Sequence, residues 1–193
     1  MMSKILFTIF LAGFINLSLF AQHDNALVSR LNNMFEVTVK NDFDKILDLT
    51  CPELFTLGSK EDVKAALQEA FANEGMEMKI NSAVLDTIYP VFLHDNKKFT
   101  VVKYKMNMRM KFTQPQDSLF WSFIVPMMDA QFGTKSTTVL PQENALDIKT
   151  TSRLVATKKD DQTDWCFLNY DTSKGMIAII FDSELINKIE SYK

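Results

Sequence analysis

Few side chains in this sequence have the chemistry that acid–base catalysis requires, and they are widely separated. The sequence contains two histidines, His23 and His94, and Asp95 follows the second. An Asp–His pair, or an Asp with a Tyr, is the usual acid–base equipment of a small enzyme pocket. Because residues 94–96 separate two strand-like segments, we expect His94 and Asp95 to lie in a solvated hairpin turn. The alternative is a dyad at the mouth of a pocket.

Asp86 and Tyr104 are the other candidates for acid–base chemistry. Asp86 is in phase with Val84 and Ile88 on a predicted strand, which could turn its carboxylate inward, but we favour exposure at the strand end. No Cys, His and acidic residues have metal-ligand spacing, and there is neither a glycine-rich phosphate loop nor a G-x-S-x-G motif. The sequence therefore predicts no catalytic residue, no metal site and no cofactor. Lyase or isomerase chemistry at Asp86 or Tyr104 is the alternative.

The segment 98–112 alternates between apolar and polar residues, and the rest of the chain is expected to pack around it. Its even positions from 102 onward are apolar, and most of its odd positions are cationic. This period of two predicts a long β-strand with one buried and one solvated face. A strand of this length should twist and bend, so we expect a strongly curved antiparallel sheet. The cationic positions predict a solvated outer face with acidic cross-strand neighbours, or alternatively a surface for an anionic ligand; they are Lys103, Lys105, Arg109 and Lys111.

Methionines are concentrated on the apolar face of this strand. Met106, Met108 and Met110 alternate along it, and Met76 and Met78 lie on the strand before it. Methionine is flexible and polarisable, so such a row can fill a core or line a pocket for a hydrophobic molecule. If a pocket exists, we predict these ligand-binding residues: Tyr104, Met106, Met108, Met110, Trp121 and Phe123.

The segment 119–128 is apolar except for Ser122 and is predicted to be a helix inserted between strands. Asp117 or Ser118 can cap it, Pro126 should kink it, and Gly133 can end it. A helix that is apolar on nearly all sides must be covered or must cover something else. Three interpretations remain open: a buried plug, a lid over a pocket, and a docking surface for a partner or membrane.

The remaining segments complete an α+β pattern. Helices are predicted from about 25 to 40, from 43 to 49, from 60 to 73 and from 183 to 192, and the third begins with Ser59 as its cap and Asp62 three residues later. Strands are predicted at 76–88, 91–93, 145–158 and 165–170. The segment 176–181 fits a strand or a helix, and its β-branched residues favour a strand.

Two segments resemble a known family. The run 39–49, VKNDFDKILDL, is similar to the helix–Asp–helix opening of nuclear transport factor 2-like and SnoaL-like domains, and 163–170, TDWCFLNY, resembles a late strand of the same domains. The resemblance implies a cone-shaped fold with a pocket between helices and a concave sheet, and homodimers formed through the sheet. The family contains isomerases, cyclases, dehydratases and many non-enzymatic binders, so fold alone does not give function. The apolar insertion departs from the family pattern.

The N-terminus predicts export. Lys4 precedes a largely apolar run over 5–20, and Ala21 offers a small residue before a cut ahead of Gln22. We therefore expect a signal peptide over 1–21, a single domain over 22–193, and a secreted or periplasmic location. No later segment has the sequence of a membrane span, and the net charge of −3 argues against a general nucleic-acid binder.

Cys51 and Cys166 are the only cysteines. Export would place them in an oxidising compartment, where a bond between them is possible. Sequence does not show whether their Cα atoms come close enough, and we expect two independent buried thiols. Together, these features predict an exported, non-catalytic α+β domain with an apolar pocket that binds a hydrophobic small molecule or a protein partner. An acid–base pocket enzyme and an assembly module acting through the sheet face are the alternatives.

Overall fold

The computed structural model describes residues 24–159, 164–170, 175 and 177–192. Within them, seven strands form one antiparallel sheet in the order β1-β2-β4-β6-β5, with β3 pairing with β4 and β7 with β6. The strands are β1 (Ala72–Asn73), β2 (Met76–Ile88), β3 (Phe92–His94), β4 (Lys97–Phe112), β5 (Thr137–Leu140), β6 (Ala145–Lys159) and β7 (Cys166–Tyr170). The sheet is open, and β4 at its centre pairs along nearly its whole length with β6 and from Val102 to Phe112 with β2.

Helices precede the sheet, interrupt it and follow it. They are α1 (Asn25–Val39), α2 (Phe43–Leu49), α3 (Lys60–Phe71), α4 (Ser118–Phe132), α5 (Ile177–Ile180) and α6 (Ser183–Glu190), with short 3-10 turns at Pro52–Thr56 and Pro141–Glu143. Aspartate or serine side chains cap most of them: Asp24, Asp42, Ser59, Asp117 and Asp182 begin α1, α2, α3, α4 and α6. These caps satisfy backbone N–H groups that the first helical turn leaves unpaired.

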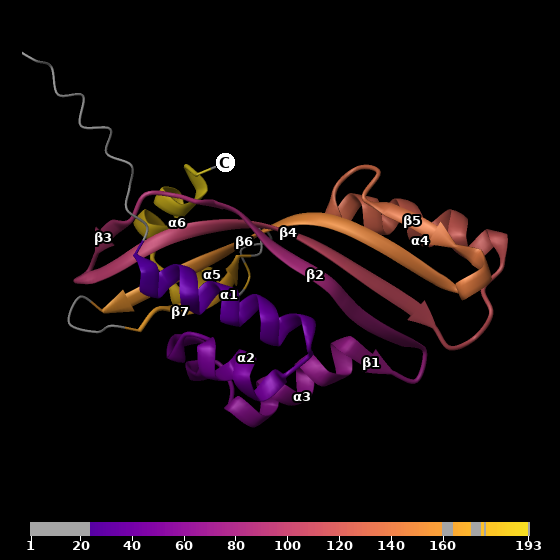
Figure 1. Ribbon diagram of the computed structural model, residues 1–193, viewed down its shortest axis with the longest axis horizontal. Coiled ribbons are helices and arrows are strands. Elements are labelled where there is room, and N and C mark those ends of the chain that lie inside the picture. The colour runs from indigo at the N-terminus through magenta and orange to yellow at the C-terminus, as the bar shows by residue number, and fades with distance from the viewer. Residues whose placement is uncertain (1–23, 160–163, 171–174, 176, 193) are drawn as a thin grey trace, which may run out of the picture.

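Figure 1 shows the helices in three groups around the strands. α1, α2 and α3 lie together on one side of the sheet, α4 lies beside β5 at one end of the molecule, and α5 and α6 lie at the opposite end. Each group covers its own apolar cluster. The first contains Leu27, Leu31 and Trp165, the second contains Phe99, Val101 and Ile189, and the third contains Met108, Met110 and Met128.

Alternation along β4 distributes its side chains between the two faces of the sheet. Val102 and Tyr104 join the cluster under α1, and Met108 and Met110 join the cluster under α4. Successive residues of a strand point to opposite faces, so both helix groups cover the even-numbered face of β4. On the odd-numbered face, Val101 lies under α5 and α6, whereas Lys105 and Lys111 are exposed.

The α+β class, the N-terminal helices packed on the antiparallel sheet and the inserted α4 confirm the sequence prediction. Three elements differ from the prediction. β1 and β5 are not predicted, because two and four residues are too short to show a period. The segment predicted as a strand at 176–181 contains the helix α5, whose Ile177 is buried together with Phe181 one helical turn later. Tertiary packing therefore overrides the β-propensity of its isoleucines.

The two cysteines form a disulfide bond, which corrects the prediction of independent thiols. Cys51 and Cys166 lie with their Cα atoms 4.8 Å apart. Their approach follows from an isolated parallel bridge between Thr50 and Phe167 and from the hydrogen bond that Cys51 N donates to Phe167 O. This pairing between the end of α2 and β7 has no signature in the sequence.

Candidate binding surfaces

The acid–base candidates Asp86 and Tyr104 lie on different faces of the sheet. Asp86 is exposed, as predicted. Its Oδ1 lies 2.9 Å from the Nζ of Lys105 on the odd-numbered face of β4, which we call the outer face of the sheet. The hydrogen bond from Lys105 lowers the pKa of the Asp86 carboxyl. Tyr104 is buried with its ring 5.3 Å from that of Phe35, and burial raises its pKa. Neither side chain lines a described cavity, so the two do not form an acid–base site.

His94 corrects the prediction of a solvated turn. The backbone does turn at Asp95 and Asn96, both with positive φ, but the His94 side chain is only 16% exposed. Its Nε2 lies 2.7 Å from Asp182 Oδ2 and 3.7 Å from Asp95 Oδ2. The hydrogen bond with Asp182 raises the pKa of His94. Because Asp182 Oδ1 accepts the N–H of Leu185 at the start of α6, the cluster joins the β3–β4 hairpin to that helix.

The predicted methionine row is packed rather than hollow. Met108 and Met110 are buried between the strands and α4, where they meet Ile148 and Met128. Met106 is half-buried at the border between the clusters under α1 and under α4. Trp121 reaches the same cluster from α4, whereas Tyr104 belongs to the neighbouring one. The structure thus brings Met106, Met108, Met110 and Trp121 together, as part of a filled core.

α4 has one packed face and one exposed face. Its packed side chains, which contribute to the cluster under α4, are Trp121, Ile124, Val125, Met128 and Phe132. On the other face, Leu119 is 63% exposed, Phe123 72% and Met127 55%. Their spacing of four residues places the three on one stripe, which we call the outer row. The hydroxyl of Ser122 beside this row donates to the carbonyl of Leu119, so it adds little polarity to the surface.

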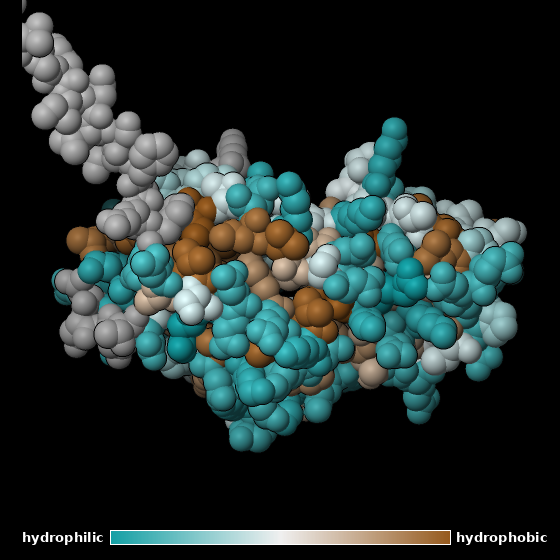
Figure 2. Space-filling view, in the orientation of Figure 1, coloured by the Kyte–Doolittle hydropathy of each residue, from teal (hydrophilic) through white to brown (hydrophobic). Residues whose placement is uncertain are grey.

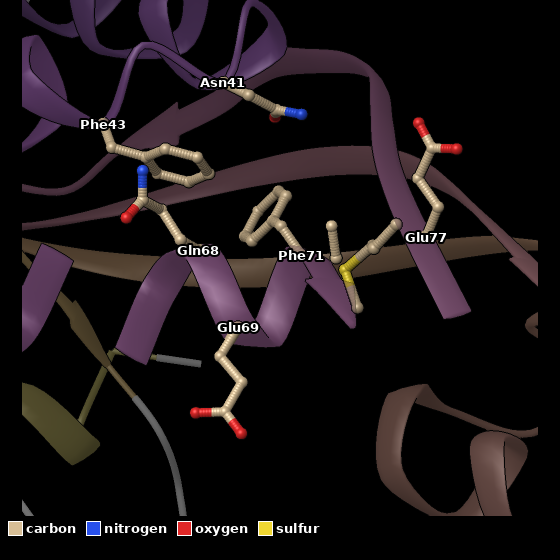
Figure 3. A pocket seen from close by; sticks show the side chains of 8 residues that line it. Asn41, Phe43, Gln68, Glu69, Phe71 and Glu77 are labelled. Carbon is tan, nitrogen blue, oxygen red and sulfur yellow. The ribbon is translucent and has the colours of Figure 1, made fainter. Parts of the chain in front are cut away.

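Three open cavities lie elsewhere in the described part of the chain. One of about 400 Å³ lies between α3 and the start of β2, where the rings of Phe43 and Phe71 meet edge to face at 5.4 Å. Figure 3 shows these rings side by side, with Glu69 and Glu77 extending away from them. Asn41 also lines this cavity, and its Oδ1 is buried without a hydrogen-bond partner among the described residues. This cavity is small and its edges are polar.

A second cavity, of about 500 Å³, follows the contact between α1 and β2. Phe35 and Val39 from α1 and Ala83 and Leu85 from β2 supply its apolar lining. Figure 2 shows hydrophobic surface gathered in the middle of this side of the molecule, with hydrophilic surface over α2 and α3. β2 is an edge strand here, since β1 pairs only with its first two residues. The two register shifts between Ile80 and Thr87 twist this edge, a feature that discourages strand addition.

The largest of the three cavities, of about 700 Å³, is lined mainly by residues of the outer face of the sheet, and Met106 and Thr150 of the opposite face also border it. Strands β2, β4 and β6 supply two cross-strand rows: Ser82–Asn107–Lys149 and Val84–Lys105–Thr151. Residues 132–136, which include the last residue of α4 and the turn after it, form a wall of this cavity. The sequence pattern places Lys105 in a cationic row but does not predict Lys135 and Lys149 beside it. Strand register brings Lys149 to the cavity, and the turn after α4 brings Lys135.

The predicted acidic neighbours of the cationic row are present. Arg109 Nε lies 2.7 Å from Asp147 Oδ1, and its Nη1 lies 2.5 Å from Glu143 Oε2. Lys105 pairs with Asp86, as described above, and Lys111 lies opposite Glu77 in the register of β2 and β4. Most of the row is therefore a solvated, charge-balanced sheet face.

No protein-family model matches this chain, and a search of curated proteins finds no significant match. Among the described residues, no helix has both the length and the apolar character to cross a bilayer.

Proposed function

We propose that this protein is a non-catalytic binding domain that holds a protein partner against the outer row of α4. The observation that carries the proposal is the exposure of Leu119, Phe123 and Met127 on one helical stripe. Contiguous large apolar side chains on a protein surface mark interaction sites. Met108 and Met110 are packed in a core cluster. This favours a protein partner over a hydrophobic small molecule bound within the methionine row.

The partner proposed for this row is the apolar stripe of an amphipathic helix. Side chains at i, i+4 and i+8 form a ridge that fits the groove of a second helix. The first residues of α4 carry no acidic side chain and its last turn no basic one, so burial of apolar area would supply most of the binding free energy. The predicted signal peptide, which lies outside the described residues, would place this partner outside the cytoplasm.

Site-specific photocrosslinking tests the proposal. The photoreactive analogue p-benzoylphenylalanine would replace Phe123 in the outer row, or Leu93 as the control, since Leu93 is 67% exposed on β3. Each variant would be irradiated in the producing cells, and the adducts identified by mass spectrometry. We expect a defined adduct from position 123 that position 93 does not form.

Competition experiments establish whether the crosslinked partner binds at the outer row. Excess wild-type chain and the Leu93→Ser variant should both abolish the adduct, whereas Phe123→Ser should not compete. If the adduct contains a second copy of this chain, the outer row binds that copy in a dimer and not a different protein. Equal crosslinking from positions 93 and 123, or full competition by Phe123→Ser, would reject α4 as the binding surface.

A further inference from the structure

The cavity on the outer face of the sheet is distinct from the outer row of α4, and the charged side chains that line it are all lysines. Lys105, Lys135 and Lys149 line it, and all three are exposed. Lys105 is paired with Asp86, but neither Lys135 nor Lys149 forms an ion pair with any described residue. Lys149 does act electrostatically on Asp147, but the carboxylate of Asp147 is already bound to Arg109. Three ammonium groups around one concavity, only one of them in an ion pair, create a positive local potential in a chain whose net charge is −3.

The lysines come from elements that the structure holds in place. Asn107 lies opposite Lys149 on β6, and Lys105 is two residues before Asn107 on β4, so alternation sends all three side chains to one face. Lys135 projects from the turn after α4. Asp129 fixes this turn, because its carboxylate accepts the N–H groups of Lys135 and Thr137, each at 3.0 Å. The arrangement of the cations is therefore set by sheet register and by a bonded turn.

The lining between the lysines is suited to a small organic molecule. Val84 is 57% exposed and supplies an apolar patch, while Thr134 and Thr151 supply hydroxyl groups. The Oδ1 atom of Asn107 is buried without a hydrogen-bond partner among the described residues. Buried polar groups in proteins are normally paired, with water or a ligand where protein groups do not suffice. Because this oxygen accepts hydrogen bonds, it would pair with water or with a hydroxyl group of a bound molecule and not with its anionic group. A volume of about 700 Å³ is in the range of small-molecule sites.

We propose that this cavity binds a small organic oxyanion, with Lys135 and Lys149 as the charge-recognising side chains. A phosphate, sulfate or carboxylate group would lie between the two ammonium groups, and the rest of the molecule would lie against Val84 and Thr151. The unpaired lysines distinguish this site from the neighbouring part of the sheet face, where Arg109 is already neutralised by Asp147 and Glu143. The site does not depend on the partner surface of α4.

Isothermal titration calorimetry with pyrophosphate, citrate and a disulfated disaccharide tests this site and separates the three kinds of oxyanion. The expected result is saturable binding of at least one probe to the wild-type chain. Lys135→Gln and Lys149→Gln should each weaken it about tenfold, because each removes one charge-assisted contact. Raising the salt from about 20 to about 200 mM should weaken it as well.

Lys111→Gln is the matched control, since Lys111 is an exposed lysine on the same face of β4 but outside the cavity. It should change the affinity less than about twofold. Absence of saturable binding by all three probes at low salt would overturn the proposal. So would an equal loss in Lys111→Gln and Lys149→Gln, which would indicate attraction by the whole face. Tighter binding of a single-stranded oligonucleotide that grows with its length would also exclude a small-molecule site.

Discussion

The carboxylate of Asp24 accepts a hydrogen bond of 2.9 Å from the indole Nε1 of Trp165, which lies 141 positions later in the chain. The same carboxylate caps α1 and lies 3.0 Å from Lys158 Nζ. Trp165 is buried under α1, so this contact joins the first helix to the last strands of the sheet. A single side chain thereby caps the start of a helix, satisfies a buried indole and neutralises a lysine.

Asp24 should make the fold sensitive to acid. The hydrogen bonds from Trp165 and then from Lys158 lower the pKa of the Asp24 carboxyl from 3.8 to about 2. Its stabilising contribution is therefore complete above pH 3.8 and is lost as the pH falls towards 2. Asp24→Asn should lower the free energy of unfolding at neutral pH by about 1–2 kcal/mol, less than the full shift implies because solvent screens the partly exposed carboxylate.

Urea denaturation between about pH 2 and 7 measures this contribution. Trp165→Phe keeps a smaller aromatic ring at this position and removes the N–H donor. Its Asp24 carboxyl should therefore titrate at a higher pH than in the wild type, as NMR of the carboxyl carbon would show. An unchanged Asp24 pKa in Trp165→Phe would mean that the indole contributes nothing to the shift.

His94 should give the opposite pH dependence. Its pKa is raised by the hydrogen bond with Asp182, so the protonated imidazole stabilises the fold. This contribution is complete below 6.5 and is lost as the pH rises through the raised pKa. Asp182 has a lowered pKa, chiefly because it accepts the N–H of Leu185, so the ion pair persists down to acidic pH. The wild-type free energy of unfolding should therefore decrease as the pH rises above 6.5 and through the raised pKa of His94.

The matched variants for this test are His94→Gln and His23→Gln, which remove the two histidines one at a time. Denaturation at a series of pH values should show the decrease in His23→Gln and a flatter profile in His94→Gln. A decrease of the same size in His94→Gln would assign the dependence to another group.

The Cys51–Cys166 disulfide should be a major source of stability. It closes a loop with a sequence separation of 115, for which the chain-entropy model gives about 4–5 kcal/mol. A Cys51→Ser/Cys166→Ser variant should unfold at a correspondingly lower urea concentration, and reduction of the wild type should have a similar effect. Thiol titration of the unreduced, denatured chain is the control. Two reactive thiols per chain would contradict the bond.

Local rules account for most of the elements in this fold. β4 and the caps Ser59 and Asp117 follow from alternation and from side chains that accept the first helical N–H groups. The hairpin at 95–96 follows from residues that tolerate positive φ. These features depend on a few adjacent positions, so the sequence alone predicts them.

The surfaces depend instead on pairing between distant segments. Lys149 reaches the outer cavity only because β6 pairs with β4 in one particular register. His94 is bonded only because α6 begins beside the hairpin. Trp121 and Phe123 were predicted to share one site, yet helical geometry places residues two apart on different faces of α4. Sequence patterns give the composition of a surface, and tertiary contacts decide its position.

The two aromatic side chains of α4 should respond differently to truncation. Trp121 packs into the core, with its ring 5.6 Å from that of Phe112 and 5.2 Å from that of Phe120, whereas Phe123 is 72% exposed. Trp121→Ala should lower the free energy of unfolding by about 2–3 kcal/mol, below the value for a fully buried tryptophan. Phe123→Ala should change it by less than about 0.5 kcal/mol. Urea denaturation of both variants checks the pair. A large loss in Phe123→Ala would place the outer row in a core, and no loss in Trp121→Ala would make α4 a detachable lid. The expected asymmetry requires a helix that is anchored through one face and free to bind through the other.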